Sequence, residues 1–561
     1  MRSLARMLLV LLVPVLALGQ ANTSNNGSTN GSMADELKQL RDAIAQQQQQ
    51  IAQQQKQIDT LQNALDQKNG SEAHLQDASL RVNNTQPSVT PAAAAVAQEA
   101  KETPKESPLS FRIGGTEFTP GGFLDFENVF RTTNTGNQSA TNFWAIPFSN
   151  TVAGHMTEYR STAQYSRFNL KVAGKYGANN FVGYIETDFN GNDATNVFVT
   201  SNSHTLRLRL YWLDLKRDKW EILAGQVWGL QTPNRVGISP NPSDLQITYG
   251  EDAQTHVGLN YTRAAAIRVG YHFNDNFVWA VEAQNPQQFA GQGAEVVFPT
   301  VFNAQLTTGA AGGTAQIDPA ASNNTPNVMP DFLTKFAYDT NLSGKHFHFE
   351  GGGLVTSAKV TVLPNVTGAL FGNHTNFGGG FFAGGNFEPV KNFRVVASGM
   401  YGPGISRYLL AAGPQVVVVP TIAANSVTCT NAAGCDVRLS PVHAGDALVG
   451  LEAQPYPKTQ IGVYGGAAYF QRNTFQDITS AAAAKPFIGF GGPNSAQNNN
   501  RLLQEASVDW LQTFWRNPQY GAILVVTQAS YVSRAPWFVA AGAPKNAHLA
   551  MGYLSLRYVL P

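Results

Sequence analysis

The sequence is poor in charge and in cysteine, and each shortage narrows what the chain can be. Only 13% of its 561 residues are charged, and the formal net charge is +1. A charge so close to zero argues against a broad nucleic-acid-binding surface, so we expect no nucleic-acid partner. The two cysteines, Cys429 and Cys435, lie six residues apart in a loop-like stretch. In an exported chain this spacing favours a local disulfide over a metal site, which would need further ligands nearby.

Sequence motifs for catalysis are also missing. We find neither GxSxG nor HExxH, and "LSGKH" at 342–346 lacks the upstream glycine of a phosphate-binding loop. His346, His348 and Glu350 lie on one face of a predicted strand and are the one candidate metal site. Polar lining of an aqueous channel explains them equally well, with Phe347 and Phe349 facing lipid. We therefore expect no enzyme activity, no metal and no cofactor.

Long apolar runs are absent, and the one short run lies at the start of the chain. Arg2 and Arg6 precede an apolar stretch from Met7 to Leu18, which small residues follow. This order is typical of a secretory signal peptide, which we assign to residues 1–20. The run is too short for a comfortable membrane span.

A heptad pattern follows within residues 33–70. Apolar residues recur at the core positions of a coiled coil: Leu37, Leu40, Ile44, Ile51, Ile58, Leu61 and Leu65. Such a helix cannot bury its apolar seam alone, so the pattern predicts self-association, for which we favour a trimer. A lone glutamine-rich helix or a disordered tract is the alternative. Residues 71–110 are rich in Pro, Ala and Thr without periodicity, and we assign them to a flexible linker.

The remainder, 111–561, consists of short segments with alternating apolar and polar residues, and we find no convincing helix in it. We predict sixteen strands at 121–132, 163–175, 178–190, 204–216, 218–229, 256–273, 276–285, 330–340, 345–359, 373–388, 391–403, 444–455, 458–471, 500–516, 518–533 and 546–559. The connections between them alternate between tight turns and longer loops. A soluble sandwich has no reason for this regularity, whereas an even-numbered antiparallel barrel with both termini at its tight-turn end requires it.

Residues 205–212, "TLRLRLYW", show the expected alternation. Leu206, Leu208, Leu210 and Trp212 would face lipid, with Arg207 and Arg209 on the opposite face. Aromatic residues near predicted strand ends suit the girdles of a membrane barrel: Trp212, Trp220, Trp228, Phe514 and Trp515. The predicted fold is therefore all-β, a 16-stranded antiparallel transmembrane β-barrel preceded by a short α-helical coiled coil. A barrel of this size leaves an aqueous channel.

Cationic residues predicted to face the lumen are the candidates for a function. They are Arg167, Lys171, Arg207, Arg209, Arg268 and Arg394. Inward Arg and Lys lower the barrier for anions in a pore. The alternative is that they pair with acidic residues such as Asp125, Glu127, Glu186 and Asp188, which would leave little selectivity. The loop at 230–255 is our candidate for a constriction.

The order of signal, heptads, linker and barrel, with "LRLRLYWLDL", "LAGQVWGLQTP" and "AVEAQNP", resembles the DcaP-like trimeric porins of Gram-negative outer membranes. The resemblance implies a homotrimer in the outer membrane, a periplasmic coiled coil, and passive diffusion of small anionic solutes such as dicarboxylates. Phosphate-selective porins are the rival family. A different hypothesis makes the barrel a lipid-embedded anchor, with the coiled coil contacting the cell wall or a periplasmic partner.

Overall fold

A computed structural model describes residues 107–136, 140–191, 204–241, 256–291, 295–307, 315–318, 325, 327–364, 370–410, 412–424, 426–429 and 434–561. The predicted signal peptide, the heptads and nearly all of the predicted linker lie outside these residues.

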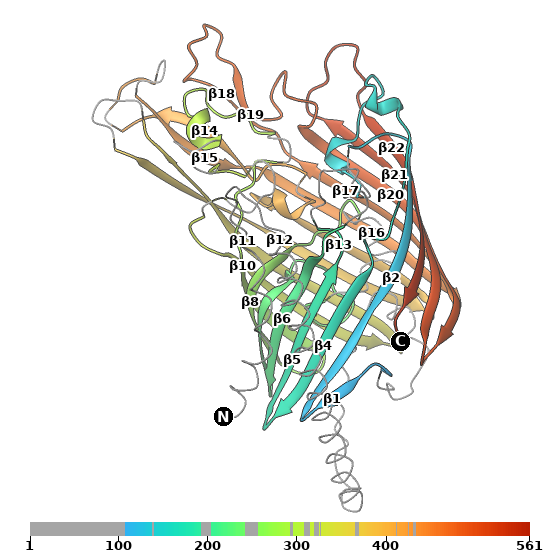
Figure 1. Cartoon of the computed structure of the whole chain (residues 1–561). Coiled ribbons are helices and arrows are strands. Elements are labelled where there is room, and N and C mark those ends of the chain that lie inside the picture. Colours follow the sequence, from blue (N-terminus) through green and yellow to red (C-terminus); the bar gives the residue numbers. More distant parts are fainter. Residues whose placement is uncertain are drawn as a thin grey trace, which may run out of the picture. The chain divides into compact units, whose positions relative to one another are not determined.

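Sixteen antiparallel strands form one closed barrel (Figure 1). In ring order they are β2 (Thr116–Arg131), β4 (Arg167–Tyr176), β5 (Asn179–Asp188), β6 (Arg207–Arg217), β7 (Trp220–Trp228), β8 (Arg263–His272), β9 (Phe277–Gln284), β10 (Asp331–Leu342), β11 (Lys345–Val362), β12 (Gly372–Val390), β13 (Phe393–Pro403), β16 (His443–Tyr456), β17 (Thr459–Phe470), β20 (Asn500–Asn517), β21 (Gly521–Pro536) and β22 (Ala547–Val559). The ring closes where β2 pairs with β22, from Phe123 opposite Val559 to Arg131 opposite Met551. Each of the sixteen predicted strands overlaps one strand of this ring, although several of their bounds differ.

Tight turns and long connections alternate around the ring, as predicted. The turns contain residues that tolerate a left-handed backbone, such as Asn392 with φ of 64° and Gly344 with φ of 78°. Both ends of the barrel chain lie at the tight-turn end, where the Ser107 hydroxyl donates to the carbonyl of Pro561 over 3.0 Å. We call this the turn end, and the opposite end the loop end.

The first barrel strand has two partners on one side. The first half of β2 pairs with β4, and its second half pairs with the short strand β3 (Glu158–Thr162). A three-residue strand, β1 (Phe111–Ile113), also pairs with the start of β2. Neither short strand was predicted, because each has too few residues to show a period.

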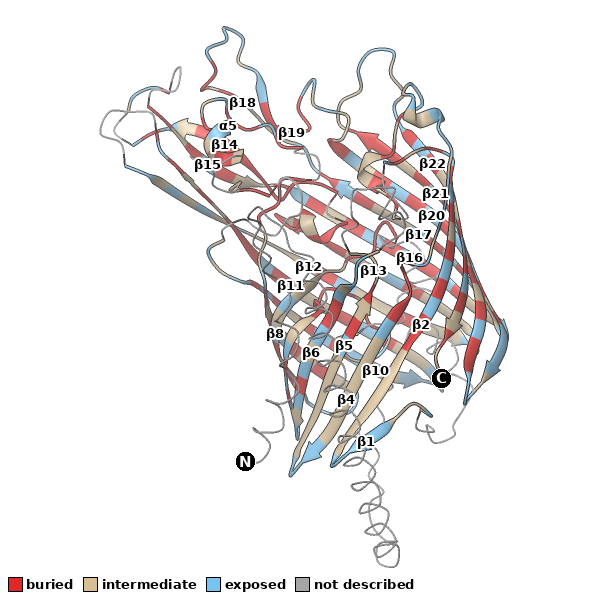
Figure 2. Ribbon diagram, in the orientation of Figure 1, coloured by how far each residue is buried: buried red, intermediate tan, exposed pale blue. Residues whose placement is uncertain are grey.

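The two faces of the barrel differ in chemistry and in burial; Figure 2 shows buried and exposed residues alternating along the strands. On β2, Leu124, Phe126 and Phe130 are about half exposed, whereas Asp125 and Glu127 are buried on the inner face. In water this pattern would expose a large apolar surface, but in hydrocarbon it is favourable because closure pairs every strand edge. Among the described residues, no helix combines the length and apolarity needed to cross a membrane.

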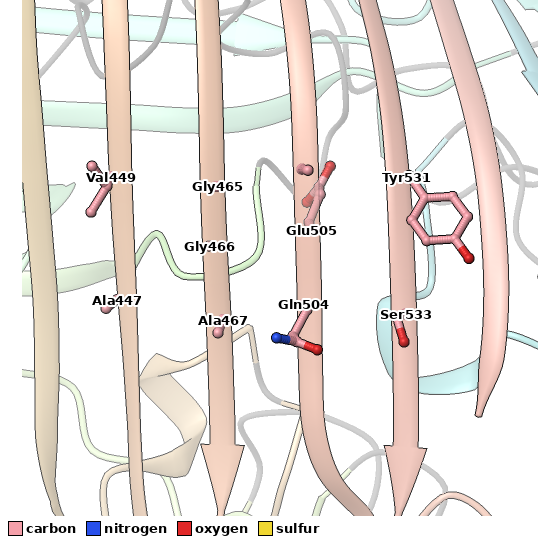
Figure 3. A pocket seen from close by; sticks show the side chains of 10 residues that line it. Ala447, Val449, Gly465, Gly466, Ala467, Gln504, Glu505, Tyr531 and Ser533 are labelled. Atoms are coloured by element: carbon pink, nitrogen blue, oxygen red, sulfur yellow. The ribbon is translucent and has the colours of Figure 1, made fainter. Parts of the chain in front are cut away.

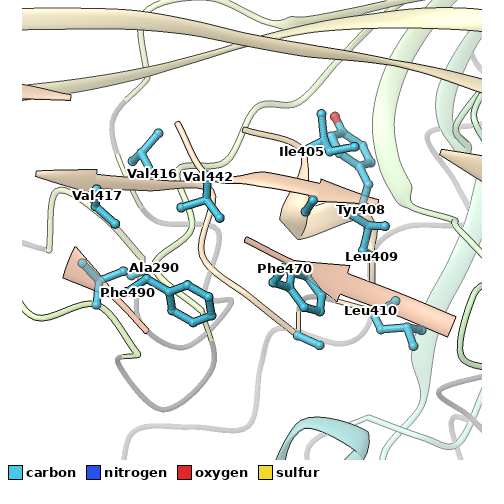
Figure 4. Close-up of a cluster of buried hydrophobic side chains, with 14 of the residues drawn as sticks. Ala290, Ile405, Tyr408, Leu409, Leu410, Val416, Val417, Val442, Phe470 and Phe490 are labelled. Carbon is cyan, nitrogen blue, oxygen red and sulfur yellow. The ribbon is translucent and has the colours of Figure 1, made fainter. Parts of the chain in front are cut away.

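The loop end carries a buried apolar core, which is built by connections from different parts of the barrel (Figure 4). The short elements there are α5 (Asn303–Thr307), β14 (Val416–Ile422), β15 (Cys435–Pro441), β18 (Asn473–Gln476) and β19 (Phe487–Phe490). Arg407 and Tyr408 both bind Asp331, which ties this core to the barrel wall. In the same region, burial raises the pKa of the Glu295 carboxyl well above its usual range. The core was not predicted, because its residues meet only in three dimensions.

Cys429 and Cys435 form a disulfide, and their Cα atoms lie 4.6 Å apart. Cys435 begins β15, which pairs with β14 from Ile422 opposite Cys435 to Val416 opposite Pro441. The disulfide therefore closes the loop of the β14–β15 hairpin.

A charge on the outer face should destabilise the barrel. Leu554 lies mid-strand on β22 and is 49% exposed, so Leu554→Arg would place a guanidinium in hydrocarbon. We expect the free energy of unfolding in lipid vesicles to fall by about 2–4 kcal/mol. Asn546→Arg, in the exposed loop before β22, is the matched control and should change stability little. Equal effects of the two substitutions would show that Leu554 does not face lipid.

Candidate channel lumen

A belt of alternating charge crosses five neighbouring strands on the inner wall. We use "charged belt" for the following side chains, in ring order from β22 to β6: Arg557, Asp125, Arg167, Glu186, Asp188, Arg209 and Arg207. Each strand contributes one sign of charge, and adjacent strands contribute opposite signs. This arrangement places every guanidinium beside a carboxylate.

The distances within the charged belt are those of ion pairs. Arg209 donates to Glu186 Oε1 over 2.7 Å and to Asp188 Oδ2 over 2.8 Å. Arg207 donates to Asp188 over 2.7 Å, and Arg557 donates to Asp125 over 2.8 Å. Charge-assisted hydrogen bonds of this length fix the orientation of both partners.

Arg167 joins the two halves of the charged belt. Its Nε lies 3.7 Å from Glu186 Oε1. Its guanidinium carbon lies 5.2 Å from the centre of the Phe123 ring, and that of Arg557 lies 4.3 Å from the same ring. Phe123 therefore links the two guanidiniums by cation–π contacts. Arg557 and Phe123 were missed, although Arg557 follows the apolar Leu554 and Leu556 in the same alternation that identified Arg207.

A β-bulge in β6 changes which residues face the lumen. Glu186 lies opposite Leu210 but Thr187 lies opposite Leu208, so Arg209 is the extra residue. After the bulge the alternation reverses. The prediction that Leu210 and Trp212 face lipid is therefore wrong: Leu210 is 1% exposed and both pack inside the barrel. Tyr211, Leu213 and Leu215 are exposed on the outer face instead.

Three other predicted lumen cations lie outside the charged belt. Arg268 on β8 lies 2.7 Å from Glu282, and Arg394 on β13 lies 3.3 Å from Glu452. Lys171 lies on the inner face of β4, opposite Tyr184 on β5. The structure thus groups Arg167, Lys171, Arg207 and Arg209 on β4 and β6 but places Arg268 and Arg394 farther round the ring.

The predicted aromatic girdle also needs correction. Trp220, Phe514 and Trp515 are exposed on the outer face, as expected. Trp228 is 4% exposed and packs inside the barrel with Tyr261, at a ring separation of 5.3 Å. The position of a tryptophan near a strand end therefore does not predict which face of the barrel it lies on, because an inward loop can bury an aromatic side chain on the inner face.

The connection between β7 and β8, residues 229–262, folds into the lumen; its residues 242–255 lie outside the described ranges. Its first part follows the wall formed by β10, β11 and β16. The backbone N–H of Asn234 donates to Glu350 over 3.1 Å, and Lys335 donates to the Asn234 side chain over 2.7 Å. Arg235 reaches Glu452 over 2.6 Å.

The second part of this connection docks on the far wall. The backbone N–H of Val257 donates to Glu505 over 2.8 Å, and Asn260 donates to Asp446 over 2.7 Å. In the ring of sixteen strands β8 is the sixth and β20, which carries Glu505, is the fourteenth, so the loop reaches the opposite side. Residues 256–262 were predicted to begin a strand, and the structure places them in this loop.

Glycines allow the loop and the far wall to touch. A Cβ on Gly466 would lie 1.8 Å from the Val257 carbonyl oxygen, and one on Gly258 would lie 2.1 Å from the Ala447 carbonyl oxygen. An apolar cluster completes the crossing, since loop residue Leu259 belongs to the same buried cluster as Leu210 on β6 and Leu448 on β16. The described part of the loop thus crosses the lumen and narrows it.

His346, His348 and Glu350 do share the inner face, as predicted. His348 lies 2.8 Å from Asp339 and 3.3 Å from Glu350, and Lys335 lies 2.6 Å from Glu350. These contacts form an ion-pair network. Within the described ranges, no group of three or more His, Cys, Asp or Glu side chains is arranged to hold a metal ion.

A hollow of about 530 Å³ lies along β16, β17, β20 and β21 (Figure 3). Small residues such as Ala447, Gly465 and Ala506 line it, and they are exposed on the outer face. The hollow is therefore a depression in the outer surface of the barrel, separate from the lumen.

Fold and lumen together define the class: a 16-stranded barrel with the architecture of outer-membrane channels. No protein-family model matches the sequence, and no curated protein sequence matches it. The outer-membrane channel DcaP of Acinetobacter baumannii has a similar structure, with a TM-score of 0.51 and 15% identity over 80% of this chain and 99% of DcaP. OprB of Pseudomonas putida matches with a TM-score of 0.41 and 11% identity, over 79% of this chain and 94% of OprB. The likeness to DcaP shows that the chain has a DcaP-like porin fold.

The contact between loop and far wall can be tested at two adjacent glycines. Gly466→Val would push the Val257 carbonyl away from β17 and into the lumen, so we expect single-channel conductance to fall and become noisier. Gly465→Val is the matched control, because a Cβ there meets nothing within 4 Å. Unchanged conductance in folded Gly466→Val protein would show that this contact does not shape the pore.

Proposed function

We propose that the protein is an outer-membrane diffusion porin that lets small hydrophilic, mainly anionic solutes such as dicarboxylates pass through its lumen. The observation that carries the proposal is a closed ring of sixteen strands with a charged inner wall that an inward loop narrows. Sixteen strands enclose more space than side chains fill, so the lumen holds water.

Anion preference is supported by the balance of charge near the charged belt. The charged belt itself carries four guanidiniums and three carboxylates, an excess of one positive charge, and next to it the charge of Lys171 is balanced by that of Glu117. Because the low-dielectric wall focuses the field into the water, even a small excess biases the entry of ions. The ion pairs within the belt keep the excess small, so the proposed selectivity is modest.

We further propose a homotrimer with its turn end in the periplasm. Both ends of the described barrel chain lie at the turn end. On this proposal, the heptad segment within residues 33–70 binds its copies in neighbouring protomers.

If the charged belt determines selectivity, removing its arginines and removing its carboxylates should shift the reversal potential in opposite directions. In the variant Arg207→Ala with Arg209→Ala, Asp188 loses its hydrogen bonds from both arginines and Glu186 loses its hydrogen bond from Arg209. We expect the reversal potential under a salt gradient in planar bilayers to shift toward cation preference. Replacing the acids instead, by Glu186→Gln with Asp188→Asn, should shift it toward anions.

Arg217 provides the control, because it lies at the turn end of the same strand with its side chain 65% exposed. Arg217→Ala should leave the reversal potential close to that of the parent protein. If both double variants fold and neither shifts the reversal potential, the belt does not determine selectivity.

Deleting residues 33–70 separates the barrel from the predicted coiled coil. We expect conductance per protomer to persist, because all sixteen described barrel strands come from later residues. We also expect the trimers to dissociate at a lower temperature when unboiled samples are run on gels. Loss of conductance, together with loss of envelope attachment in cells, would instead favour the hypothesis that the barrel is an anchor.

A further inference from the structure

An aromatic pair stands on the inner wall next to the charged belt. Tyr184 on β5 lies opposite Trp212 on β6, with ring centres 5.5 Å apart and ring planes 23° from parallel. Both side chains are partly exposed, unlike the buried Leu210 and Trp228 that they pack against. Part of each ring is thus open to the lumen.

The polar ends of both rings are fixed, which holds the pair in place. The Tyr184 hydroxyl donates to Glu186 over 2.9 Å, and the Trp212 indole N–H donates to Asn241 over 3.1 Å. Glu186 in turn accepts from Arg209. Because the polar edges are engaged, the surface left for a solute is apolar ring, directly beside guanidinium and carboxylate groups.

The bulge at Arg209 is what creates this arrangement. Without the bulge, an unbroken alternation starting from the inward-facing Arg207 would place Tyr211 in the lumen. Trp212 would then lie on the outer face, in lipid. The extra residue places the indole ring of Trp212 on the same face of β6 as the two arginines. Bulges often serve to re-aim a side chain at a functional site.

We propose that Tyr184 and Trp212, with Arg207, Arg209, Glu186 and Asp188, form a subsite for a cyclic carbohydrate that carries a carboxylate. This inference rests on the proposed porin function and names a class of solute for it. The apolar C–H face of a sugar ring stacks on an aromatic ring, and the solute carboxylate accepts from Arg207.

The aromatic pair favours this class over a simple dicarboxylate, which has no ring face to stack on it. Among the charged side chains of the subsite, Arg207 is 32% exposed, whereas Arg209, Glu186 and Asp188 are buried in ion pairs. The solute carboxylate therefore binds at Arg207 while the sugar ring lies on Tyr184 and Trp212. A ring with an apolar C–H face and one carboxylate matches both kinds of group on this wall.

The test measures ion-current fluctuations of the full-length protein in planar bilayers with glucuronate, glucose or succinate added. We expect glucuronate to interrupt the current at the lowest concentration. Trp212→Ala and Tyr184→Ala should each weaken the apparent affinity for glucuronate by about three- to tenfold, the range of one aromatic contact. The current carried by salt alone should remain.

Tyr211→Ala is the matched control, since Tyr211 is the neighbouring aromatic residue on the outer face. It should leave the glucuronate affinity unchanged. The proposal is overturned if succinate is bound as tightly as glucuronate, if glucose is bound as tightly, or if folded Trp212→Ala and Tyr184→Ala keep the parent affinity. In each of these cases the salt current still identifies a pore, whereas absence of any current would contradict the proposed function itself.

Discussion

The closure of the sheet is the constraint on which the rest of the structure depends. In hydrocarbon every backbone N–H and C=O must find a partner within the protein, and a sheet meets this requirement only when its first and last strands pair. Here β2 and β22 do so over nine residue pairs, from Phe123 to Arg131 on β2. Once the ring is closed, its outer face must be apolar, and polar groups are confined to the inner wall and the two ends.

Confinement of charge explains the form of the charged belt. Arg209 and Asp188 are both nearly buried, and an unpaired buried charge would cost several kcal/mol. Alternating the sign from strand to strand gives each side chain an opposite charge beside it. The same pairing limits the net charge of the lumen, so selectivity has to arise from a small excess and from the geometry of the narrowed passage. The inward loop uses the wall carboxylates Asp446 and Glu505 as hydrogen-bond acceptors, which fixes its position on the far wall.

The strand pattern was predictable from the sequence because closure imposes a period of two on each strand. Leu124, Phe126 and Phe130 fall on the outer face as the alternation indicates. The period fails at Arg209, where one extra residue reverses the faces of everything that follows on β6. No local feature of "LRLRLYWL" announces the bulge, since either assignment leaves apolar residues on the outer face. Pairing between particular residues, such as Arg557 with Asp125 across 432 positions of sequence, depends on register and could not be read from alternation alone.

Loops were the least predictable part for a related reason. The crossing of the lumen at Val257 needs a carbonyl oxygen to approach Gly466 closely, a contact between residues more than 200 positions apart. The sequence of 230–255 suggested a constriction, yet residues 256–262 resembled the start of a strand because they alternate as strands do. In the structure they bind the far wall instead of extending β8.

Single-channel recording of the unmodified protein in planar bilayers tests the central claim most directly. The account predicts stepwise current increases, with a reversal potential under a salt gradient that is displaced modestly toward anions. A protein that is folded and inserted, as judged by protease resistance and strand content, but that carries no current would contradict it.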